Sequence, residues 1–249
     1  NGSTELPAGD RGASALIVLD GKGGRWHEIP YIEADANHRL TRVSVKAAAD
    51  GALTGTINVE NVGDFAPGIR RALESDGDRK QKLEQWYSSQ YPGLTLEHAE
   101  VSDLANLEQP VSMKFDFAGG RWVDATGQTW MLRPFGDDSE LASRIAPIPI
   151  RTLPLEFDEP YRSEEIHELT LPAGTYVDAA PADMDVDTPA VHVHISLRFE
   201  PGKVTAHYVF ELRQVRVEPE DYPEFRRKMN EVEALLDRTY RFAPQGGAR

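Results

Sequence analysis

Alternating apolar and polar residues indicate a β-hairpin in the first half of the chain, over 41–61. Its two runs are separated by the turn sequence Ala-Asp-Gly at 49–51. A period of two indicates strands with one buried and one hydrated face. The apolar positions of this pattern are Val43, Val45, Ala47, Leu53, Ile57 and Val59.

A second and stronger hairpin is predicted over 190–218. If Phe199 pairs with Val204 across the turn, the apolar residues of both strands fall on one face, and a slip of one residue would expose all of them. The same register places His192 opposite Glu211 on the polar face. These apolar residues are Val193, Ile195, Leu197, Ala206, Tyr208 and Phe210.

A helix is predicted after each hairpin. The first spans about 66–90 and is expected to break near Ser75 to Asp78, where a capping residue can restart it and Gly77 weakens its interior. The second begins near Pro223 and extends to about 240. Its apolar residues recur at helical spacing and predict a buried stripe formed by Phe225, Met229, Val232, Leu235 and Leu236.

The junction between hairpin and helix is written twice. Each copy has an Asp that can cap the helix, an aromatic residue, a Pro suited to the first turn and two consecutive arginines. The arginines can hold carboxylates or backbone carbonyls, or they can lie over an aromatic ring with their charged ends in water, which is the commoner arrangement. The copies are Asp64, Phe65, Pro67, Arg70 and Arg71, and Asp221, Tyr222, Pro223, Arg226 and Arg227.

These patterns predict a β-rich α+β fold. We expect two sandwich-like lobes of antiparallel sheet, each with a hairpin followed by a helix packed on the sheet. Residues 1–14 are predicted as a linker, 15–145 as the first lobe and 146–249 as the second. The run Ala15–Asp20 is expected to be a short buried strand, ended by a turn at 21–24.

Composition narrows the function. The net charge is −14, so the surface should repel nucleic acid and anionic lipid, and no nucleic-acid partner is expected. No apolar segment is long enough to span a membrane. The chain has no cysteine, which removes thiol catalysis, disulfides and thiolate metal sites together. It also starts without a methionine, which we interpret as the mark of a fragment or a processed form.

The polar face of the second hairpin provides the strongest candidate for a metal site. His192 and His194 lie two residues apart on one strand and therefore point the same way, while His207 and Glu211 face them from the other strand. Imidazole and carboxylate groups suit Zn or Cu. Ser196, Arg198 and Thr205 on the same face favour an ordinary hydrated surface instead.

Three other patterns are weaker. Trp26, Trp122 and Trp130 could form a platform for a sugar or a peptide, although buried Trp is more common. Acidic residues at 183, 185 and 187 have the spacing of a calcium loop, but Thr188 stands where glycine is needed, which favours a hydrated turn. Carboxylates are plentiful, including Glu164, Glu165 and Glu168, and nothing in the sequence selects two of them as a catalytic pair.

The chain resembles the C-terminal part of bacterial transglutaminase-like proteins. The resemblance rests on "ELPAGDRGASALIVLDGKGGRWHEIPYIEADANHRLTRVSVKAAADGALTGTI", and on the end of the chain from "RSEEIHELTLPAGTYVDAAP" to "PEDYPEFRRKMNEVEALLDRTYRF", which is similar to the domain of unknown function that follows the core in that family. The resemblance implies an extracytoplasmic, periplasmic or cell-surface protein. It also implies a papain-like core upstream, with a Cys, His and Asp triad.

No catalytic residue of that family can be placed on this sequence, because its nucleophile is a cysteine. We therefore expect a non-catalytic accessory region without a cofactor, with the core of the same chain and a cell-envelope protein as partners. The parent chain would be the cysteine hydrolase or transglutaminase-like enzyme. Two alternatives stay open: an independent metal protein or enzyme built on the histidine face, and a carbohydrate- or peptide-binding β module.

Overall fold

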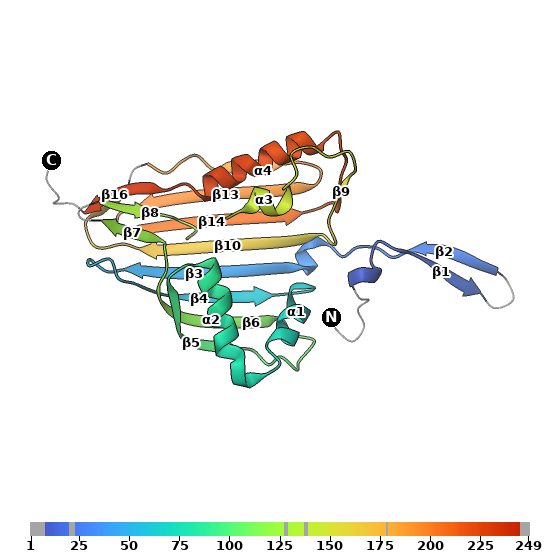
Figure 1. Ribbon diagram of the computed structural model, residues 1–249, viewed down its shortest axis with the longest axis horizontal. Helices are drawn as coiled ribbons and strands as arrows, with labels where there is room; N and C mark the ends of the chain where they lie inside the picture. Colours follow the sequence, from blue (N-terminus) through green and yellow to red (C-terminus); the bar gives the residue numbers. More distant parts are fainter. Residues whose placement is uncertain (1–7, 20–22, 127–128, 137–138, 178, 245–249) are drawn as a thin grey trace.

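The computed structural model of the protein describes residues 8–19, 23–126, 129–136, 139–177 and 179–244. An eight-stranded sheet in the order β12-β13-β14-β10-β3-β4-β6-β5 dominates the fold (Figure 1). Its strands are β3 (His38–Ala47), β4 (Leu53–Asn61), β5 (Leu94–Val101), β6 (Val111–Gly119), β10 (Tyr161–Thr170), β12 (Met184–Asp187), β13 (Val191–Glu200) and β14 (Lys203–Leu212).

Both predicted hairpins are confirmed. β3 pairs with β4 and β13 pairs with β14, each antiparallel, and Phe199 lies opposite Val204 as the apolar pattern requires. The apolar residues of both hairpins are buried on one side of the sheet, and Val43 and Val193 each have about 1% or less of their surface exposed. The period of two therefore determined both the strands and their register.

The two hairpin units are joined in one sheet. β10 pairs antiparallel with β14 on one side and parallel with β3 on the other, so this strand connects the two halves of the chain. All other neighbouring strands in the large sheet are antiparallel. The β-rich α+β class is thus confirmed, and the relation between the two halves, which the sequence left open, is an edge-to-edge continuation of hydrogen bonding.

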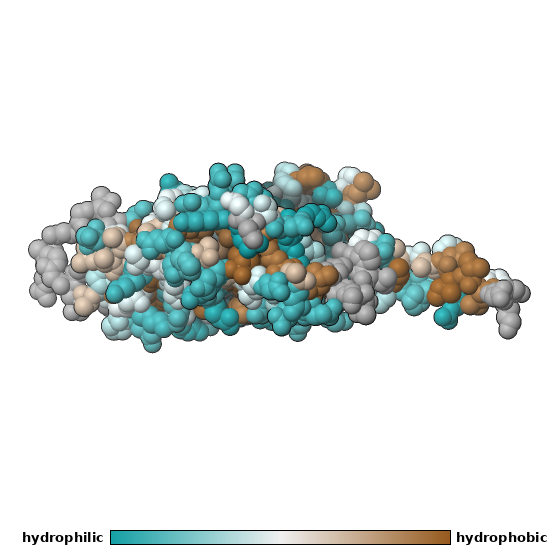
Figure 2. All heavy atoms as spheres, turned by 90° about the horizontal axis from the view of Figure 1, so that it is seen from below, coloured by the Kyte–Doolittle hydropathy of each residue, from teal (hydrophilic) through white to brown (hydrophobic). Residues whose placement is uncertain are grey.

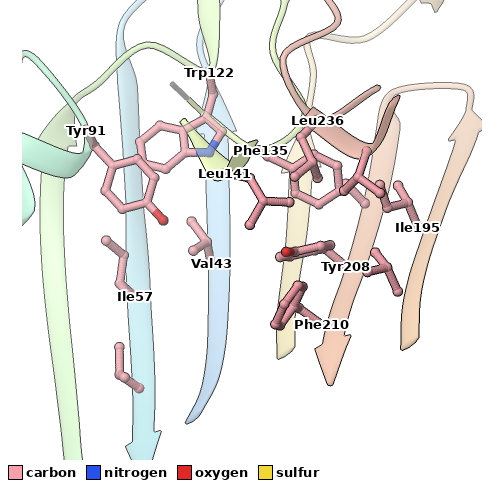
Figure 3. Packing of buried hydrophobic residues seen from close by; sticks show 14 of the residues in the cluster. Val43, Ile57, Tyr91, Trp122, Phe135, Leu141, Ile195, Tyr208, Phe210 and Leu236 are labelled. Carbon is pink, nitrogen blue, oxygen red and sulfur yellow. The ribbon is translucent and has the colours of Figure 1, made fainter. Parts of the chain in front are cut away.

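The helices cover the same face of this sheet. They are α1 (Phe65–Ala72), α2 (Arg79–Gln90), α3 (Leu141–Ile145) and α4 (Tyr222–Leu236), with 3-10 turns η1 (Ala8–Asp10), η2 (Ala34–Ala36) and η3 (Asp76–Asp78). Buried residues of both halves form one hydrophobic cluster. In Figure 3, Trp122 and Tyr91 of the first half and Tyr208 and Phe210 of the second lie on the same side of the sheet.

Both helical predictions hold in outline. The first helix breaks into α1, η3 and α2 at the predicted place, and α4 begins one residue before Pro223. The burial of Phe225, Met229, Val232 and Leu236 confirms the predicted stripe, to which Leu235 adds a partly buried contact. No helix in the described part of the chain is long and apolar enough to cross a membrane.

Three smaller sheets complete the described structure. A four-stranded sheet has the order β11-β16-β8-β7, and two-stranded sheets pair β1 with β2 and β15 with β9. The strands are β1 (Ser14–Leu19), β2 (Gly23–Glu28), β7 (Val123–Thr126), β8 (Thr129–Leu132), β9 (Leu155–Glu156), β11 (Thr175–Val177), β15 (Arg216–Val217) and β16 (Tyr240–Pro244).

The prediction for the first strand was wrong in its burial. β1 does form, but it pairs only with β2, and this hairpin projects from the body of the molecule (Figure 1). Leu16 and Val18 are 52% and 77% exposed. An apolar run predicts a strand but cannot show whether the protein itself covers it. Residues 1–7 of the predicted linker and 20–22 of the predicted turn lie outside the described residues.

Candidate functional site: the open sheet face and the projecting arm

The polar face of β13 and β14 has the predicted register. His192 lies opposite Glu211, and the rings of His194 and His207 approach to 5.9 Å between centroids. The helices cover the other side of the sheet, so this face is open to water. The sequence pattern thus placed three imidazoles and a carboxylate on one surface correctly.

The four side chains do not converge on a common point; each lies beside a different neighbour. His194 Nδ1 lies 2.8 Å from Asp185, His207 Nε2 lies 2.9 Å from Glu164, and His192 Nδ1 lies 3.5 Å from Asp187. Glu211 accepts a hydrogen bond from Arg213 Nε at 3.1 Å.

Within the described residues, no group of three or more His, Asp or Glu side chains has the arrangement needed to hold a metal ion. Metal binding at His192, His194, His207 and Glu211 therefore stays a prediction, and it would require these side chains to leave their present partners.

Glu164 is the electrostatic centre of this face. Burial alone would raise the pKa of its carboxyl, but hydrogen bonds from Arg162 and His207 outweigh burial and lower the pKa. Arg162 Nη2 donates to it at 2.7 Å and His207 Nε2 lies 2.9 Å away. Glu164 thus connects β10 to β14 across the hydrated side of the sheet.

The acidic residues at 183, 185 and 187 also have partners on the sheet. Arg198 binds both oxygens of Asp183 at 2.6 and 2.7 Å, and Arg213 donates to Asp187 at 2.7 Å. Met184–Asp187 forms edge strand β12, so side chains at 185 and 187 point to the open face and do not close around a cation. This arrangement agrees with the hydrated interpretation rather than a calcium loop.

Two hydrogen bonds connect Trp122, His167 and Glu165 where β10 of the second half pairs with β3 of the first. Trp122 Nε1 donates to His167 Nδ1 at 3.2 Å, so His167 carries its proton on Nε2, which faces Glu165 at 3.2 Å. His167 and Trp122 are fully buried. Full burial and hydrogen bonds at both ring nitrogens indicate a structural role for His167.

The three tryptophans do not form a platform. Trp122 and Trp130 are 0% and 4% exposed and belong to the core, in line with the commoner fate of Trp. Trp26, by contrast, is 72% exposed on β2. Trp26 is the more exposed of the two exposed tryptophans, the other being Trp86 at 37%, and it draws attention to the hairpin that carries it.

The hairpin of β1 and β2, here called the arm, has one apolar face. Its register places Leu16 opposite Trp26 and Val18 opposite Gly24. Side chains of residues 16, 18 and 26 therefore share a face. A two-stranded hairpin alone in water is marginally stable, so an arm with an uncovered apolar face lacks the packing that usually supports such a structure.

Exposed apolar residues are concentrated at one end of the sheet, here called the arm end. It is the end where β4 and β14 finish, where loop 102–110 joins β5 to β6, and where loop 146–154 leads into β9 (Figure 1). Ten large apolar side chains are exposed in the described part of the chain, and Trp86 alone lies elsewhere. The other nine are Leu16, Val18, Leu19, Trp26, Tyr31, Leu107, Ile148, Ile150 and Leu153.

Figure 2 shows apolar atoms gathered on the projecting arm, beyond a body whose visible surface is mostly polar. Scattered exposed apolar residues are normal on a soluble protein, but a gathering on one end marks an interaction surface. Acidic side chains also lie at this end: Asp35 and Glu156 have 87% and 68% of their side chains accessible.

The base of the arm is fixed to both halves of the sheet. The buried guanidinium of Arg11 lies 2.5 Å from Asp64, before α1, and 3.2 Å from Glu159, before β10. Burial raises the pKa of Glu159, although Arg11 opposes this rise. The ring of Tyr31 packs directly on Gly12, whose φ of +71° and missing Cβ both require glycine. Nothing in the sequence of residues 1–14 indicated this anchor.

The expected role of Asp at the repeat junction was wrong. Neither Asp64 nor Asp221 makes a side-chain capping hydrogen bond, and both have helical rather than extended backbone angles. A cap requires the extended conformation, in which the carboxylate can reach the first amides of the helix. The carboxylate of Asp64 turns to Arg11 instead.

The junction arginines divide into two pairs of equivalents. Arg70 donates to the carbonyls of Leu104 and Gln109 at 2.7 and 2.5 Å, and Arg226 donates to the carbonyl of Ala146 at 3.2 Å. The first arginine of each copy thus holds backbone carbonyls, which was the less common of the two arrangements considered.

The second arginine of each copy is exposed. Arg71 lies at the surface, and Arg227 pairs with Glu224 and Glu231 on its own helix. In each copy the first arginine binds backbone carbonyls of a loop outside its helix. The duplicated motif therefore starts a helix and also fixes a nearby loop.

The aromatic residue of the junction differs between the copies. The hydroxyl of Tyr222 donates to the carbonyl of Ile148 at 2.6 Å, and Arg151 lies over its ring. Phe65, which has no hydroxyl, packs edge-on against Tyr161 and lies under Arg39. Tyr222 thus gives loop 146–154 an attachment for which Phe65 has no equivalent group.

A groove of about 420 Å³ lies at the arm end, between the segment that follows the arm and the end of β14. Residues 31–35 form one wall, and Glu211 with residues 213–216 forms the other. Its arginines are already paired, Arg213 with Glu211 and Arg216 with Glu156 and Glu218. The groove extends the arm-end surface, and its paired arginines are not available to hold an anion.

Comparison with known proteins gives a partial assignment. The family described as "Domain of Unknown Function with solved-structure structure (DUF3858)" matches residues 139–240, from just before α3 to the first residue of β16. A crystal structure described as a "putative protease" from Parabacteroides distasonis ATCC 8503 is similar over 48% of this chain, with 18% identity and a TM-score of 0.39. The chain spans 24% of that protein. No curated protein matches.

Proposed function

We propose that this chain is a non-catalytic accessory region of a larger transglutaminase-like protein, and that it docks on a neighbouring domain of the same polypeptide through the arm end. The observation that carries the proposal is the position of the nine exposed large apolar residues at that end. Such a surface is stable when a partner covers it. The partner follows from the resemblance of the sequence to the C-terminal part of transglutaminase-like proteins.

A non-catalytic role is supported by the chemistry of the described residues. Cysteine is absent from the sequence, so a thiol nucleophile would have to come from elsewhere. His167, which forms hydrogen bonds with Trp122 and Glu165, is fully buried and has both ring nitrogens engaged. The open-face histidines are paired with separate carboxylates on an exposed surface rather than gathered in a cleft.

An extracytoplasmic setting, in the periplasm or at the cell surface, belongs to the same proposal and follows from the resemblance. Cell fractionation with an antibody to residues 1–249 tests the setting. Recovery of the protein with cytosolic markers would contradict it.

The catalytic part of the proposal is tested by assaying the purified chain for peptide and isopeptide hydrolysis. We expect no turnover, and we expect the codons upstream of Asn1 to encode a core with Cys, His and Asp. Turnover that a single substitution in this chain abolishes would overturn the proposal. A start codon next to Asn1 would overturn it as well, because no neighbouring domain would precede the arm.

A further inference from the structure

We propose that the two loops held by the duplicated arginines, 102–110 and 146–154, form one composite docking surface with the arm, and that the neighbouring domain of the same polypeptide covers all three. This inference rests on the proposed function and deepens it, since it states that the arm and both loops are covered together and gives the repeated junction a purpose.

Position is the first argument. β4 and β14 run in the same direction across the sheet, so the helices that follow them start at the same end. The arm joins the sheet at this end too, because it leads into the start of β3. One partner that reaches the arm therefore faces both loops.

The second argument is the way the loops present their side chains. In loop 146–154, hydrogen bonds from Tyr222 and Arg226 fix backbone carbonyls, while Ile150 and Leu153 are 80% and 72% exposed. In loop 102–110, Arg70 fixes two carbonyls and Leu107 is 51% exposed. In each case a half-buried arginine of the neighbouring helix fixes the backbone of the loop, while the apolar side chains of the loop stay in water. A loop held in this way is preorganised for a contact.

The start of loop 146–154 is also fixed by α4. Glu233 accepts a hydrogen bond from the amide of Ala142 at 2.7 Å, and Asp237 accepts one from the amide of Ser139 at 2.7 Å. These bonds hold α3 against α4, and Ile145 and Ala146 at its end are buried. The exposed apolar residues therefore stand on a rigid support.

Net charge and covalent connection indicate which partner covers this surface. The chain carries a net charge of −14, and repulsion opposes the association of two copies. A domain in the same polypeptide is held next to the arm by covalent connection, which supplies a high effective concentration and removes most of the entropic cost of association. We therefore expect the covering surface to have an apolar centre and a basic rim.

Arg70 and Arg226 are positioning residues in this account. In the isolated chain, Arg226→Gln should speed amide hydrogen exchange in loop 146–154, and Arg70→Gln should do the same in loop 102–110, because each loses the donor that fixes its carbonyls. Arg71→Gln is the matched control: it removes the same charge from the same helix at an exposed position, and it should leave both loops unchanged. Equal effects of Arg70→Gln and Arg71→Gln would remove the assigned role.

The deciding experiment compares amide hydrogen exchange of residues 1–249 alone with that of the longer polypeptide encoded by the gene. We expect exchange to slow by about tenfold or more in the arm and in both loops. Slowing in the arm alone would overturn the composite surface while leaving the proposed function intact. Unchanged exchange in all three segments would overturn both. Slowing in the isolated chain at high concentration would identify a second copy as the occupant and overturn the inference.

Discussion

Arg11 lies 2.5 Å from Asp64 in a buried ion pair that joins the base of the arm to the first hairpin unit, and the same guanidinium reaches Glu159 of the second unit. One cation thus serves two carboxylates, and Glu159 keeps one buried oxygen without a hydrogen-bond partner. Replacing Arg11 and replacing Glu159 should therefore change the free energy of unfolding by very different amounts.

Arg11→Met is expected to lower the free energy of unfolding by about 3 kcal/mol, because it leaves two carboxylates facing each other without a cation. Glu159→Gln should change it by less than about 1 kcal/mol, because the pair of Arg11 with Asp64 remains. Urea unfolding at pH 7 measures both. Equal losses in the two variants would contradict the assigned roles.

The raised pKa of Glu159 also gives a pH signature. Its protonated form is favoured by folding, so the stability that this form contributes is complete below the ordinary carboxyl pKa and is lost as the pH rises through the raised value. Glu159→Gln should remove this part of the pH dependence. An unchanged pH profile would show that Glu159 is not the group responsible.

Glu164 should show the opposite dependence. Its folded-state pKa is lowered, so the stability it contributes is present above the ordinary carboxyl pKa and is lost as the pH falls through the lowered value. Glu164→Gln should lower the free energy of unfolding at pH 7 by about 1 kcal/mol, with a smaller loss at acid pH.

Glu168→Gln is the control for this prediction. Glu168 lies on β10, the strand of Glu164, and faces the same open side of the sheet. It forms an ion pair with Lys203 of β14, but both side chains are nearly half exposed, so the loss in the free energy of unfolding should be less than about 0.5 kcal/mol. Thermal unfolding of both variants across pH 3–7 decides the matter. Identical profiles would mean that Glu164 contributes no more than a surface pair.

Zinc provides the test of the histidine face. Because each imidazole has its own carboxylate partner and the described residues offer no group of three metal ligands, we expect saturating zinc to leave the melting temperature unchanged. A stoichiometric rise that His194→Ala abolishes would establish the metal site instead. His98→Ala, which affects an exposed histidine on edge strand β5, controls for nonspecific binding.

Local pattern was sufficient for much of this fold. The register of β13 and β14 followed from the need to bury Val193 and its neighbours together, and the break between α1 and α2 followed from Gly77. Both features depend on residues close in sequence. The pairing of β10 with β3 depends on segments more than 100 residues apart, and no alternation within either strand encodes its neighbour.

The candidate site was less predictable for the same reason. The sequence placed His192 opposite Glu211 but could not show that Asp187 and Arg213 would take them as partners, since those contacts depend on side-chain conformation. The arm was identified as a strand and mistaken for a buried one. Its apolar face looks the same in sequence whether the protein or a partner covers it.

The central claim is that a neighbouring domain covers the arm, and Trp26 reports on it directly. Iodide quenching of Trp26, isolated as the difference between the parent protein and Trp26→Phe, should be strong in residues 1–249, where Trp26 is 72% exposed. In the longer polypeptide we expect the quenching of Trp26 to fall several-fold, while that of Trp86 on α2, isolated in the same way, stays constant. Equal quenching of Trp26 in the two proteins would show that the arm stays uncovered and would contradict the account.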